Sequence, residues 1–517
     1  MFGIADRVVV VKRLRVLILK PGKYGLDGYV ERFRRGFMPN ATVPYLHSMT
    51  PPELDGCTIE TQTIDEYVQT DLSYLKVLRG GDSPTLLALV GVQSHQFQRS
   101  LDLAAYALDN GVEHCVIGGP HPMTCDTSML QERGVSFALS EAETIWTEIL
   151  RDALRGELRP VYGEGRRWKQ TLDPPVLQPL SRSDLRRYVA PMLGIYPARG
   201  CPFTCNFCSV IKIAGRAIRS QDIETTLASL RAAKAAGVKL VMFTSDNFNK
   251  YPDAPALLEA MIAEKVDIPF FAQCDTQIAR QENLVDLMAR AGCFQIFVGV
   301  ESFNRKVLLA AHKAQNYPKA YGEIVRLCRS RGINTHFSNI IGFPEDTIEG
   351  VREHMDALVE LSPDAASFYI LTPIPGTQQY DEFLAAGRIF EANLDRFDGT
   401  NVVWSHDQLD PSRLRQLLFD CYHRFYSVRR LMRSHLKKCR TYVAACGLGL
   451  DLFSRYSAYR RMHPMSGGIG RVRRDRYDDY RNLRRKRFGF DIVPLPESLR
   501  LSIEDIELNN QARITMI

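Results

Sequence analysis

The chain has 517 residues, 45% of them hydrophobic and 24% charged, and a formal net charge of +7. This composition argues against wholesale disorder and a membrane-embedded class, and the length predicts two or three domains. The longest apolar runs, such as Leu86 to Val92, are far shorter than the ~20 residues of a membrane-spanning helix. Residues 1–20 lack a signal-peptide pattern. Twelve cysteines, three of them in one loop, fit a reducing compartment, and we expect a cytoplasmic protein.

Residues 1–156 predict an N-terminal domain in which strands and helices alternate. Helical spacing of apolar residues marks 97–110 and 143–155 as helices, and this alternation is typical of a doubly wound α/β sheet. Ligands of such sheets bind beyond the carboxyl ends of the strands, at the loops 21–28, 93–96 and 118–122. The strands are expected within Arg15–Lys20, Cys57–Thr63, Leu86–Val92, His114–Ile117 and Val135–Leu139.

Residues 157–193 are rich in Pro, Gly, Arg and Ser and predict a linker. From residue 194 to about residue 400, six strand-helix repeats predict a partial (β/α)6 barrel. In such a barrel the chemistry lies on the loops that follow the strands. The strands after the first are expected at Leu240–Thr244, Ile268–Cys274, Gln295–Val300, Thr335–Ile341 and Ala366–Leu371.

Three cysteines, Cys201, Cys205 and Cys208, follow the first barrel strand in a C-x3-C-x2-C arrangement. Soft thiolates in one short loop select zinc, Cu(I) or an iron-sulfur cluster. Structural zinc normally takes four protein ligands, whereas three ligands on a four-iron cluster would leave one iron open. A zinc loop and three unrelated buried cysteines remain the alternatives.

This spacing, with Phe207 just before the third cysteine, resembles the radical S-adenosylmethionine (radical SAM) superfamily. The resemblance implies a [4Fe-4S] cluster on the three cysteines, whose open iron chelates S-adenosylmethionine. Electron transfer from the cluster then cleaves this cofactor to a 5'-deoxyadenosyl radical.

The resemblance extends to residues at successive strand ends. Ser245-Asp246-Asn247 stands where the superfamily receives the S-adenosylmethionine amino group, although Asp246 is equally suited to cap a helix. Glu301 ends a strand and is expected to accept hydrogen bonds from the cofactor. Residues 340–345 resemble the element whose apolar residues flank the adenine, with Gly342 allowing close backbone approach. The expected S-adenosylmethionine contacts are Phe207, Ser245, Asp246, Asn247, Gln273, Glu301, Ile340, Gly342 and Glu345.

In residues 15–155, the order of the segments and their amino-acid sequences resemble the cobalamin-binding domain that precedes the barrel in one class of these enzymes. Val90–Ser94, the Gly118–His121 turn, Ser140–Glu143 and, after the sixth barrel strand, Pro373–Thr377 carry this likeness. No Asp-x-His-x-x-Gly segment offers a histidine to the cobalt. A domain of this fold that binds nothing is the alternative. The expected cobalamin contacts are Gln93, Ser94, Gly118, Gly119 and His121.

Residues 401–517 predict a helical, basic C-terminal region with Asp410 as an N-cap before Pro411. We interpret it as a cap on the substrate side whose arginines form a solvated surface. Contact with anionic lipid is an alternative, and no nucleic-acid motif accompanies the arginines.

The sequence thus predicts a radical SAM enzyme of three parts that uses a [4Fe-4S] cluster, S-adenosylmethionine and cobalamin. Its expected reaction is methyl transfer to an unactivated carbon of a small-molecule or lipid-like substrate, with flavodoxin or ferredoxin as electron donor. Two alternatives stay open. One is a radical cyclisation or rearrangement, and the other is a non-catalytic iron-sulfur sensor.

Overall fold

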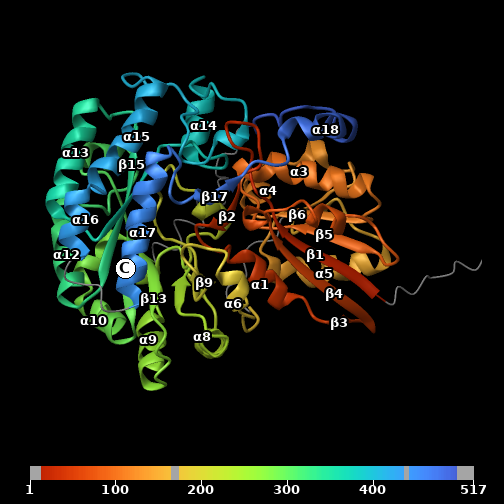
Figure 1. The fold of residues 1–517 in the computed structure, drawn as a ribbon, viewed down its shortest axis with the longest axis horizontal. Helices are drawn as coiled ribbons and strands as arrows, with labels where there is room; N and C mark the ends of the chain where they lie inside the picture. The colour runs from red at the N-terminus through yellow and green to blue at the C-terminus, as the bar shows by residue number, and fades with distance from the viewer. Residues whose placement is uncertain (1–12, 165–173, 436–441, 498–517) are drawn as a thin grey trace, which may run out of the picture.

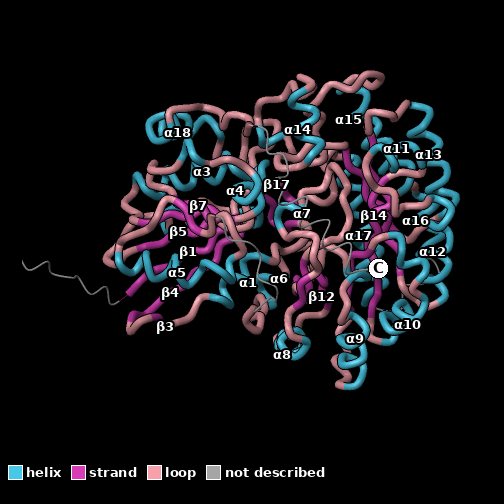
Figure 2. The backbone as a smooth tube through the Cα atoms, turned by 180° about the vertical axis from the view of Figure 1, so that it is seen from behind, coloured by secondary structure: helices cyan, strands magenta, loops and turns pink. Residues whose placement is uncertain are grey.

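The computed structural model describes residues 13–164, 174–435 and 442–497. Two β-sheets built mainly of parallel strands lie side by side along the long axis, the N-terminal sheet at one end and a helix-ringed sheet at the other (Figure 1). The view from behind shows the same two halves, with α18 (Arg481–Phe488) beside the N-terminal sheet (Figure 2).

The N-terminal sheet has the order β3-β4-β1-β5-β6-β7-β8, and only the β3–β4 pair is antiparallel. This is a doubly wound order, as predicted, and the switch point lies between β1 and β5, where such folds bind ligands. The strands are β1 Arg13–Lys20, β3 Glu53–Leu54, β4 Cys57–Asp65, β5 Thr85–Leu89, β6 His114–Gly118, β7 Ser136–Ala138 and β8 Val161–Tyr162.

Helices cover both faces of this sheet, which explains why its central strands are apolar throughout. Leu17 and Leu19 of β1 pack in one core with α3, whereas Val16 and Ile18 pack in another with α1 and α5. The connecting helices are α1 Thr42–Met49, α2 Tyr74–Val77, α3 Ser94–Asp109, α4 Pro120–Thr124 and α5 Ala142–Arg155.

The second sheet contains six parallel strands in the order β16-β15-β14-β13-β12-β9. Since no pairing joins β9 to β16 among the described residues, the sheet is the partial (β/α)6 barrel that the sequence predicts. Its strands are β9 Met192–Ile195, β12 Leu240–Phe243, β13 Phe270–Cys274, β14 Cys293–Glu301, β15 Asn334–Ile341 and β16 Ala365–Ile370.

Helices α8, α9, α10, α12 and α13 connect these strands and carry local start signals. Asp222 accepts a hydrogen bond from the Thr225 N–H at the start of α8, and Thr347 accepts one from Gly350 at the start of α13. The helices of this half are α6 Arg182–Leu185, α7 Val210–Ile213, α8 Ile223–Ala235, α9 Ala254–Ala263, α10 Glu282–Arg290, α11 Arg305–Ala310, α12 Tyr321–Ser330, α13 Ile348–Leu361 and α14 Gln378–Ala385.

Two strands lie wholly or partly inside the stretch 157–193 that the composition predicts to be a linker. β8 adds the last strand to the N-terminal sheet, and β9 begins the barrel at Met192. β8 is only two residues long, too short to show a periodicity in the sequence.

The C-terminal region is helical next to the barrel, with α15 Pro411–Phe425, α16 Val428–His435 and α17 Tyr442–Tyr459. Asp410 accepts hydrogen bonds from Ser412 and Arg413 and so caps α15 as predicted. The chain then returns to the N-terminal half, where β17 (Gly468–Val472) pairs antiparallel with β2 (Arg32–Gly36). The sequence shows no strand signal beyond about residue 400, and β17 corrects that expectation.

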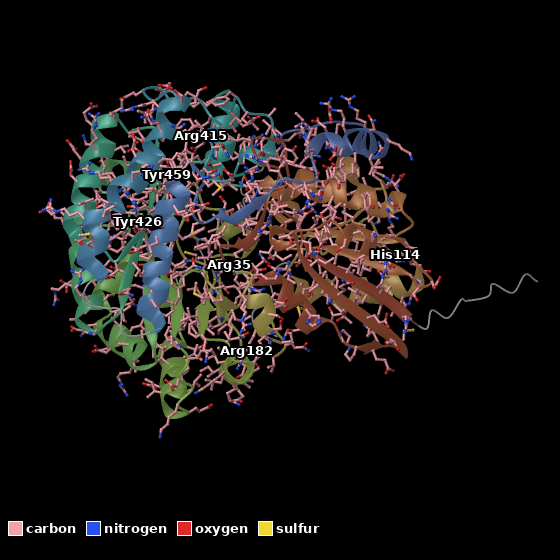
Figure 3. All side chains as sticks on the ribbon, in the orientation of Figure 1. Arg35, His114, Arg182, Arg415, Tyr426 and Tyr459 are labelled. Atoms are coloured by element: carbon pink, nitrogen blue, oxygen red, sulfur yellow. The ribbon has the colours of Figure 1, made fainter. Side chains whose placement is uncertain are left out.

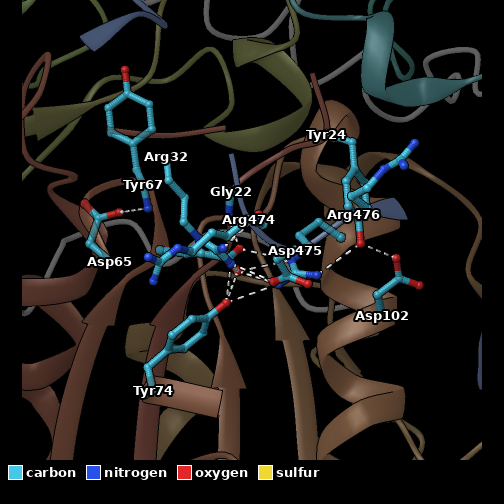
Figure 4. Close-up of polar contacts among 12 residues, drawn as sticks. Gly22, Tyr24, Arg32, Asp65, Tyr67, Tyr74, Asp102, Arg474, Asp475 and Arg476 are labelled. Atoms are coloured by element: carbon cyan, nitrogen blue, oxygen red, sulfur yellow. Dashed lines mark hydrogen bonds and ion pairs between the residues drawn. The ribbon is translucent and has the colours of Figure 1, made fainter. Parts of the chain in front are cut away.

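A buried ion-pair cluster fixes this returning segment (Figure 4). Arg32 and Arg99 both contact Glu66 and Asp475, and the three side chains from the N-terminal domain are fully buried. Burial alone would raise the pKa of Glu66, but the two arginines hold it well below its usual range. Arg484 is also fully buried and bonds Asp102 at 2.6 Å. The expected solvated arginine surface is therefore wrong for Arg484, which holds α18 against α3.

Within the described residues, no helix is both long and apolar enough to cross a membrane.

Candidate active site

The cysteine loop begins after β10 (Ala198–Arg199), which pairs with β11 (Arg219–Ser220). Gly200 has φ +105, and a Cβ on it would lie 2.3 Å from the Ala217 carbonyl oxygen, so the loop requires glycine there. The Cys201 N–H donates to the Gly215 carbonyl at 3.2 Å, which turns the chain back on itself.

The three residues after β12 hold this loop. Ser245 Oγ accepts a hydrogen bond from the Ala198 N–H at 3.2 Å, and Asp246 Oδ2 accepts one from the Gly200 N–H at 2.7 Å. The Asn247 side-chain amide then lies 3.9 Å from Cys201 Sγ. Asp246 is not the N-cap of the short turn that follows, because Asn247 occupies that position. The expected contact of these residues with S-adenosylmethionine stays a prediction, and their observed role is to position the cysteine loop.

The three thiols are half-buried and close enough to influence one another. Burial, followed by the neighbouring thiols, raises the pKa of Cys208 to about 12, and burial raises that of Cys201 to about 11. Without a ligand the Cys201 and Cys208 thiols therefore stay protonated near pH 7, and their thiolate forms require a bound metal. Gln315 reaches Cys205 Sγ at 3.6 Å. Amide donors to sulfur are a feature of iron-sulfur sites.

No group of three or more His, Cys, Asp or Glu side chains in the described ranges is arranged to hold a single metal ion. A [4Fe-4S] cluster ligates its cysteines on separate irons. The donor set of this loop, three thiols with the Asn247 and Gln315 amides beside two of the sulfurs, fits such a cluster chemically, and the assignment itself stays a prediction.

Glu301 lies at the end of β14, at an irregularity in the pairing with β15, and has φ +60. One carboxylate oxygen accepts from Lys313 Nζ at 2.5 Å, and Lys313 lies 5.7 Å from the Phe207 ring centre. The other oxygen, Oε2, is buried and has no hydrogen-bond partner among the described residues. An unpartnered buried carboxylate oxygen is costly. This side chain therefore fits a donor-bearing ligand beside the cysteine loop.

In the loop after β15, the sequence predicts that Gly342 lets the backbone approach the adenine, and the structure shows a different neighbour for this glycine. Gly342 has φ +81, and a Cβ on it would lie 2.7 Å from Leu414 of α15, so this glycine makes room for a protein side chain. Asp346 accepts the N–H groups of Gly342 and Phe343 and so shapes the loop. Burial raises the pKa of Asp346 to about 6. Glu345 is exposed, whereas Ile340 lines a cavity at the rim of the barrel.

This rim cavity, of about 230 Å³, brings the two halves of the molecule together. Gln93 and His95 reach it from the N-terminal domain, and Phe207 and Ile340 reach it from the barrel. Its lining is Gln93, His95, Phe207, Ile340, Tyr369, Ile370, Leu371, Thr372, Ile374, Phe397, Asp398 and Gly399.

A second cavity of about 250 Å³, the N-terminal cavity, opens between α5, β5 and the cysteine loop. Gly118, Gly119, Ala142 and Asp246 are among its lining residues. Gly119 has φ +135, and a Cβ on it would lie 2.2 Å from the Val92 backbone nitrogen. A glycine at this position therefore lets the loops after β5 and β6 pack together. The apolar lining fits the uncharged part of a large cofactor.

Ser94 and His121 line neither of these two cavities. His121 Nδ1 lies 3.0 Å from Ser94 Oγ and 3.3 Å from Cys125 Sγ, and its ring centre is 4.0 Å from that of Phe97. Burial lowers the pKa of His121 to about 3. Ser94 begins α3, and His121 lies in α4, which follows β6. The contact of these two residues with cobalamin stays a prediction.

The carboxylates of the Ser140–Glu143 segment bind arginines of the cysteine-loop region. Arg199 lies 3.2 Å from Glu141 and 2.8 Å from Glu143, and Arg219 lies 2.7 Å from Glu141. These buried pairs join the N-terminal domain to the residues that flank the cysteines. Sequence reasoning missed them, as it missed Lys313, because no local pattern pairs residues so far apart in the chain.

Residues 195–358 match the family model described as the radical SAM superfamily. The chain therefore contains a radical SAM domain, which forms its barrel half. Such a domain implies the [4Fe-4S] cluster and S-adenosylmethionine, and the matched range includes Cys201, Cys205, Cys208 and Glu301.

Relatives and solved structures extend this likeness beyond the radical SAM domain. The bacteriochlorophyllide d C-12(1)-methyltransferase of Chlorobaculum tepidum is 25% identical over 66% of this chain and 75% of that protein. The radical S-adenosylmethionine methyltransferase TsrM of Kitasatospora setae has a TM-score of 0.59 at 19% identity, covering 73% of this chain and 78% of that one. The cobalamin-dependent S-adenosylmethionine radical enzyme OxsB has a TM-score of 0.58 at 14% identity, covering 98% and 81%. This radical SAM chain therefore shares its fold with both structures.

Proposed function

We propose that this enzyme transfers a methyl group to a carbon of a small apolar substrate, using a [4Fe-4S] cluster, S-adenosylmethionine and cobalamin. The relatedness to a methyltransferase over two thirds of the chain supports the reaction class. The fold shared with TsrM and OxsB, two proteins described as cobalamin-bound, supports the third cofactor.

The observation that carries the proposal is the rim cavity. Gln93 and His95 follow β5, next to the switch point of the N-terminal sheet, where doubly wound folds bind ligands. Phe207 belongs to the cysteine loop, and Ile340 ends a barrel strand. A molecule in this cavity would therefore contact residues expected to serve each of two cofactors.

When bound, the cluster supplies the electron that cleaves S-adenosylmethionine, and cobalamin carries the methyl group that replaces a substrate hydrogen. The chain's own residues orient these groups. Asp246 and Ser245 hold the cysteine loop, while Glu301 offers its unpartnered oxygen to the S-adenosylmethionine amino or hydroxyl groups. Lys313 neutralises the other oxygen, so that a charged carboxylate remains stable in a buried position.

The N-terminal cavity is the proposed place for the nucleotide tail of cobalamin. Its lining is mostly apolar and comes from the N-terminal sheet, α1 and α5, with Tyr196, Ile213 and Asp246 among the residues that the barrel half adds. We assign the tail to it because the cavity lies at the carboxyl edge of that sheet, where Gly118 and Gly119 end β6.

The proposal places the enzyme in the cytoplasm, with flavodoxin or ferredoxin as the reductant. Peripheral contact of the exposed C-terminal arginines with anionic lipid is part of the same proposal, since Arg473 and Arg485 are largely exposed.

Binding of hydroxocobalamin tests the proposal and requires no knowledge of the substrate. Absorbance titration of the anaerobically purified chain should show one cobalamin per chain. Ala142→Trp, which fills the N-terminal cavity, should weaken binding, whereas Thr147→Trp on the exposed face of α5 should not. A chain that binds no cobalamin would refute the cofactor assignment, and two variants that bind it equally would refute the placement of its tail in the N-terminal cavity.

A further inference from the structure

A third cavity, the barrel cavity, lies inside the barrel and has a volume of about 560 Å³. It follows the inward faces of β12 to β16, from Asn334 and Ala365 at the start of two strands to Gln273 near the end of another. α17 covers its side through Gly447 and Leu450. Figure 3 labels Tyr426, which also lines it and follows α15.

The lining of this cavity is apolar and adaptable. Four methionines and four phenylalanines face it, and methionine fits irregular ligands because its side chain is unbranched and flexible. The volume is that of an ordinary small-molecule site. The methionines are Met38, Met192, Met242 and Met465, and the phenylalanines are Phe37, Phe271, Phe294 and Phe297.

Neutral polar groups converge in the middle of the cavity. His336 Nε2 lies 2.8 Å from Ser367 Oγ, and His336 Nδ1 lies 3.4 Å from the Gln295 amide nitrogen. Burial lowers the pKa of His336 to about 4, so the imidazole is neutral near pH 7. When the Nε2–H donates to Ser367, the serine hydroxyl proton can donate to the neighbouring Tyr369 hydroxyl or to a ligand oxygen.

Two charged groups at the amino ends of the strands are already engaged. Asp364 accepts from the Thr335 N–H and hydroxyl at 3.0 and 3.2 Å, and Arg329 donates to the Ser362 carbonyl. The third, Asp451 of α17, is also held by an interaction within the chain. The middle of the cavity therefore has apolar walls and neutral hydrogen-bonding groups, and a charged group placed there would lose its hydration without gaining an ion pair.

The barrel cavity and the rim cavity share one inward face of the barrel. Along β16, Ser367 lines the barrel cavity and Tyr369, two residues further on, lines the rim cavity. Along β15, His336 lines the barrel cavity and Ile340, four residues further on, lines the rim cavity. Residues two or four apart on a strand point to the same side. A long molecule with one end at the rim would thus continue into the barrel.

We propose that the barrel cavity binds the apolar body of the substrate, an uncharged elongated molecule with a carbonyl-type oxygen that meets Ser367. This inference rests on the proposed function, because it takes the reacting carbon to lie at the rim cavity. Neither the cluster nor S-adenosylmethionine is needed for the binding itself.

The probe is Nile red, an uncharged apolar dye with a carbonyl oxygen whose emission shifts to the blue in apolar surroundings. Titration of the full reconstituted chain should show saturable binding of one dye per chain. The anionic dye anilinonaphthalene sulfonate should bind at least tenfold more weakly. No saturable Nile red binding, or equal binding of the two dyes, would overturn the proposal.

Two glycines of α17 give a matched pair of variants. A Cβ on Gly447 or on Gly449 meets no atom within 4 Å, but only Gly447 lines the cavity and Gly449 is exposed. Gly447→Trp should weaken Nile red binding at least tenfold, and Gly449→Trp should leave it unchanged. Equal binding by the two variants would place the dye elsewhere and overturn the proposal.

Ser367→Ala provides a second measure in case Gly447→Trp does not fold. Loss of one hydrogen bond should weaken dye binding by about three- to tenfold, and unchanged binding would remove Ser367 from the site. Reductive cleavage of S-adenosylmethionine without substrate should persist in Gly449→Trp, whose substitution lies outside the cavity. If the wild-type chain binds the dye but does not cleave S-adenosylmethionine, the proposed function fails and the cavity assignment stands.

Discussion

Arg199 Nη2 lies 2.8 Å from Glu143 Oε1, which ties the residue two before the first cysteine to the N-terminal domain. Both side chains are largely buried, with 15% and 5% of their surface exposed. The cysteine loop and the N-terminal cavity thus share one ion pair. Breaking this ion pair should therefore affect both the cysteine loop and the N-terminal cavity.

Glu143→Gln should destabilise the chain by about 1.5–3 kcal/mol, the contribution of one hydrogen bond to a charged group, since Arg199 keeps Glu141 as its other partner. Burial alone would raise the pKa of Glu143, but Arg199 and the Tyr45 hydroxyl hold it below its usual range. The carboxylate therefore contributes stability above the unfolded pKa of about 4.3, and the contribution is lost as the pH falls below it. Denaturation of both proteins at pH 7 and pH 4 measures this.

The control for that variant is Glu148→Gln on the same helix, which removes a surface pair with Arg159 at 2.5 Å. Such exposed pairs contribute at most about 1 kcal/mol. If Glu143→Gln and Glu148→Gln lose the same small amount of stability, the buried pair does not join the two halves.

Asp246→Ala should loosen the cysteine loop, because the Gly200 N–H loses a charged acceptor held at 2.7 Å. A hydrogen bond to a charged group contributes about 1.5–3 kcal/mol. We expect reconstituted Asp246→Ala to lose iron faster under a chelator than wild type, with Asp246→Asn in between. Equal rates of iron loss in all three proteins would mean that the hydrogen bond between Gly200 and Asp246 does not position the cluster.

Glu301→Gln should weaken S-adenosylmethionine binding by about ten- to hundredfold, the loss expected for one charge-assisted hydrogen bond. Glu345→Gln should have little effect, because Glu345 is exposed whereas Glu301 is buried beside the cysteine loop. Calorimetric titration of each reconstituted variant gives the two affinities. A larger loss in Glu345→Gln would reverse the assignment.

The cobalt should carry no protein nitrogen, since the sequence lacks an Asp-x-His-x-x-Gly segment. His121 is held by Ser94 and Cys125, and His95 is engaged by a hydrogen bond with the Phe397 backbone. Electron paramagnetic resonance of the Co(II) form should therefore show no protein nitrogen splitting. A splitting that disappears in His95→Ala or His121→Ala would contradict the unligated cobalt.

Much of the fold could be predicted because its signals are local. Apolar runs such as Leu86–Leu89 indicate buried parallel strands, and Asp222 and Asp410 are typical N-cap residues at the starts of α8 and α15. The return of the chain to the N-terminal domain could not be predicted. β17 contains two glycines and two exposed residues, and its partner β2 lies more than 400 residues earlier.

The same distinction between local and long-range signals applies to the candidate site. The cysteines are recognisable from their spacing, which local geometry requires. The polar residues at the strand ends were placed correctly at the carboxyl edge, but their partners depend on tertiary contacts. The link from Asp246 to Gly200 spans 46 residues, and that from Lys313 to Glu301 depends on a loop conformation that no short pattern specifies.

Reductive cleavage of S-adenosylmethionine tests the central claim most directly. The anaerobically reconstituted wild-type chain, given dithionite, should convert S-adenosylmethionine to 5'-deoxyadenosine, as measured by mass spectrometry. Cys201→Ala, Cys205→Ala and Cys208→Ala combined should lose both the cluster and this activity. Cys274→Ala and Cys293→Ala should keep them, because both residues are buried in the barrel core. No 5'-deoxyadenosine above the level of the triple variant, from wild-type protein holding about four irons per chain, would contradict the account.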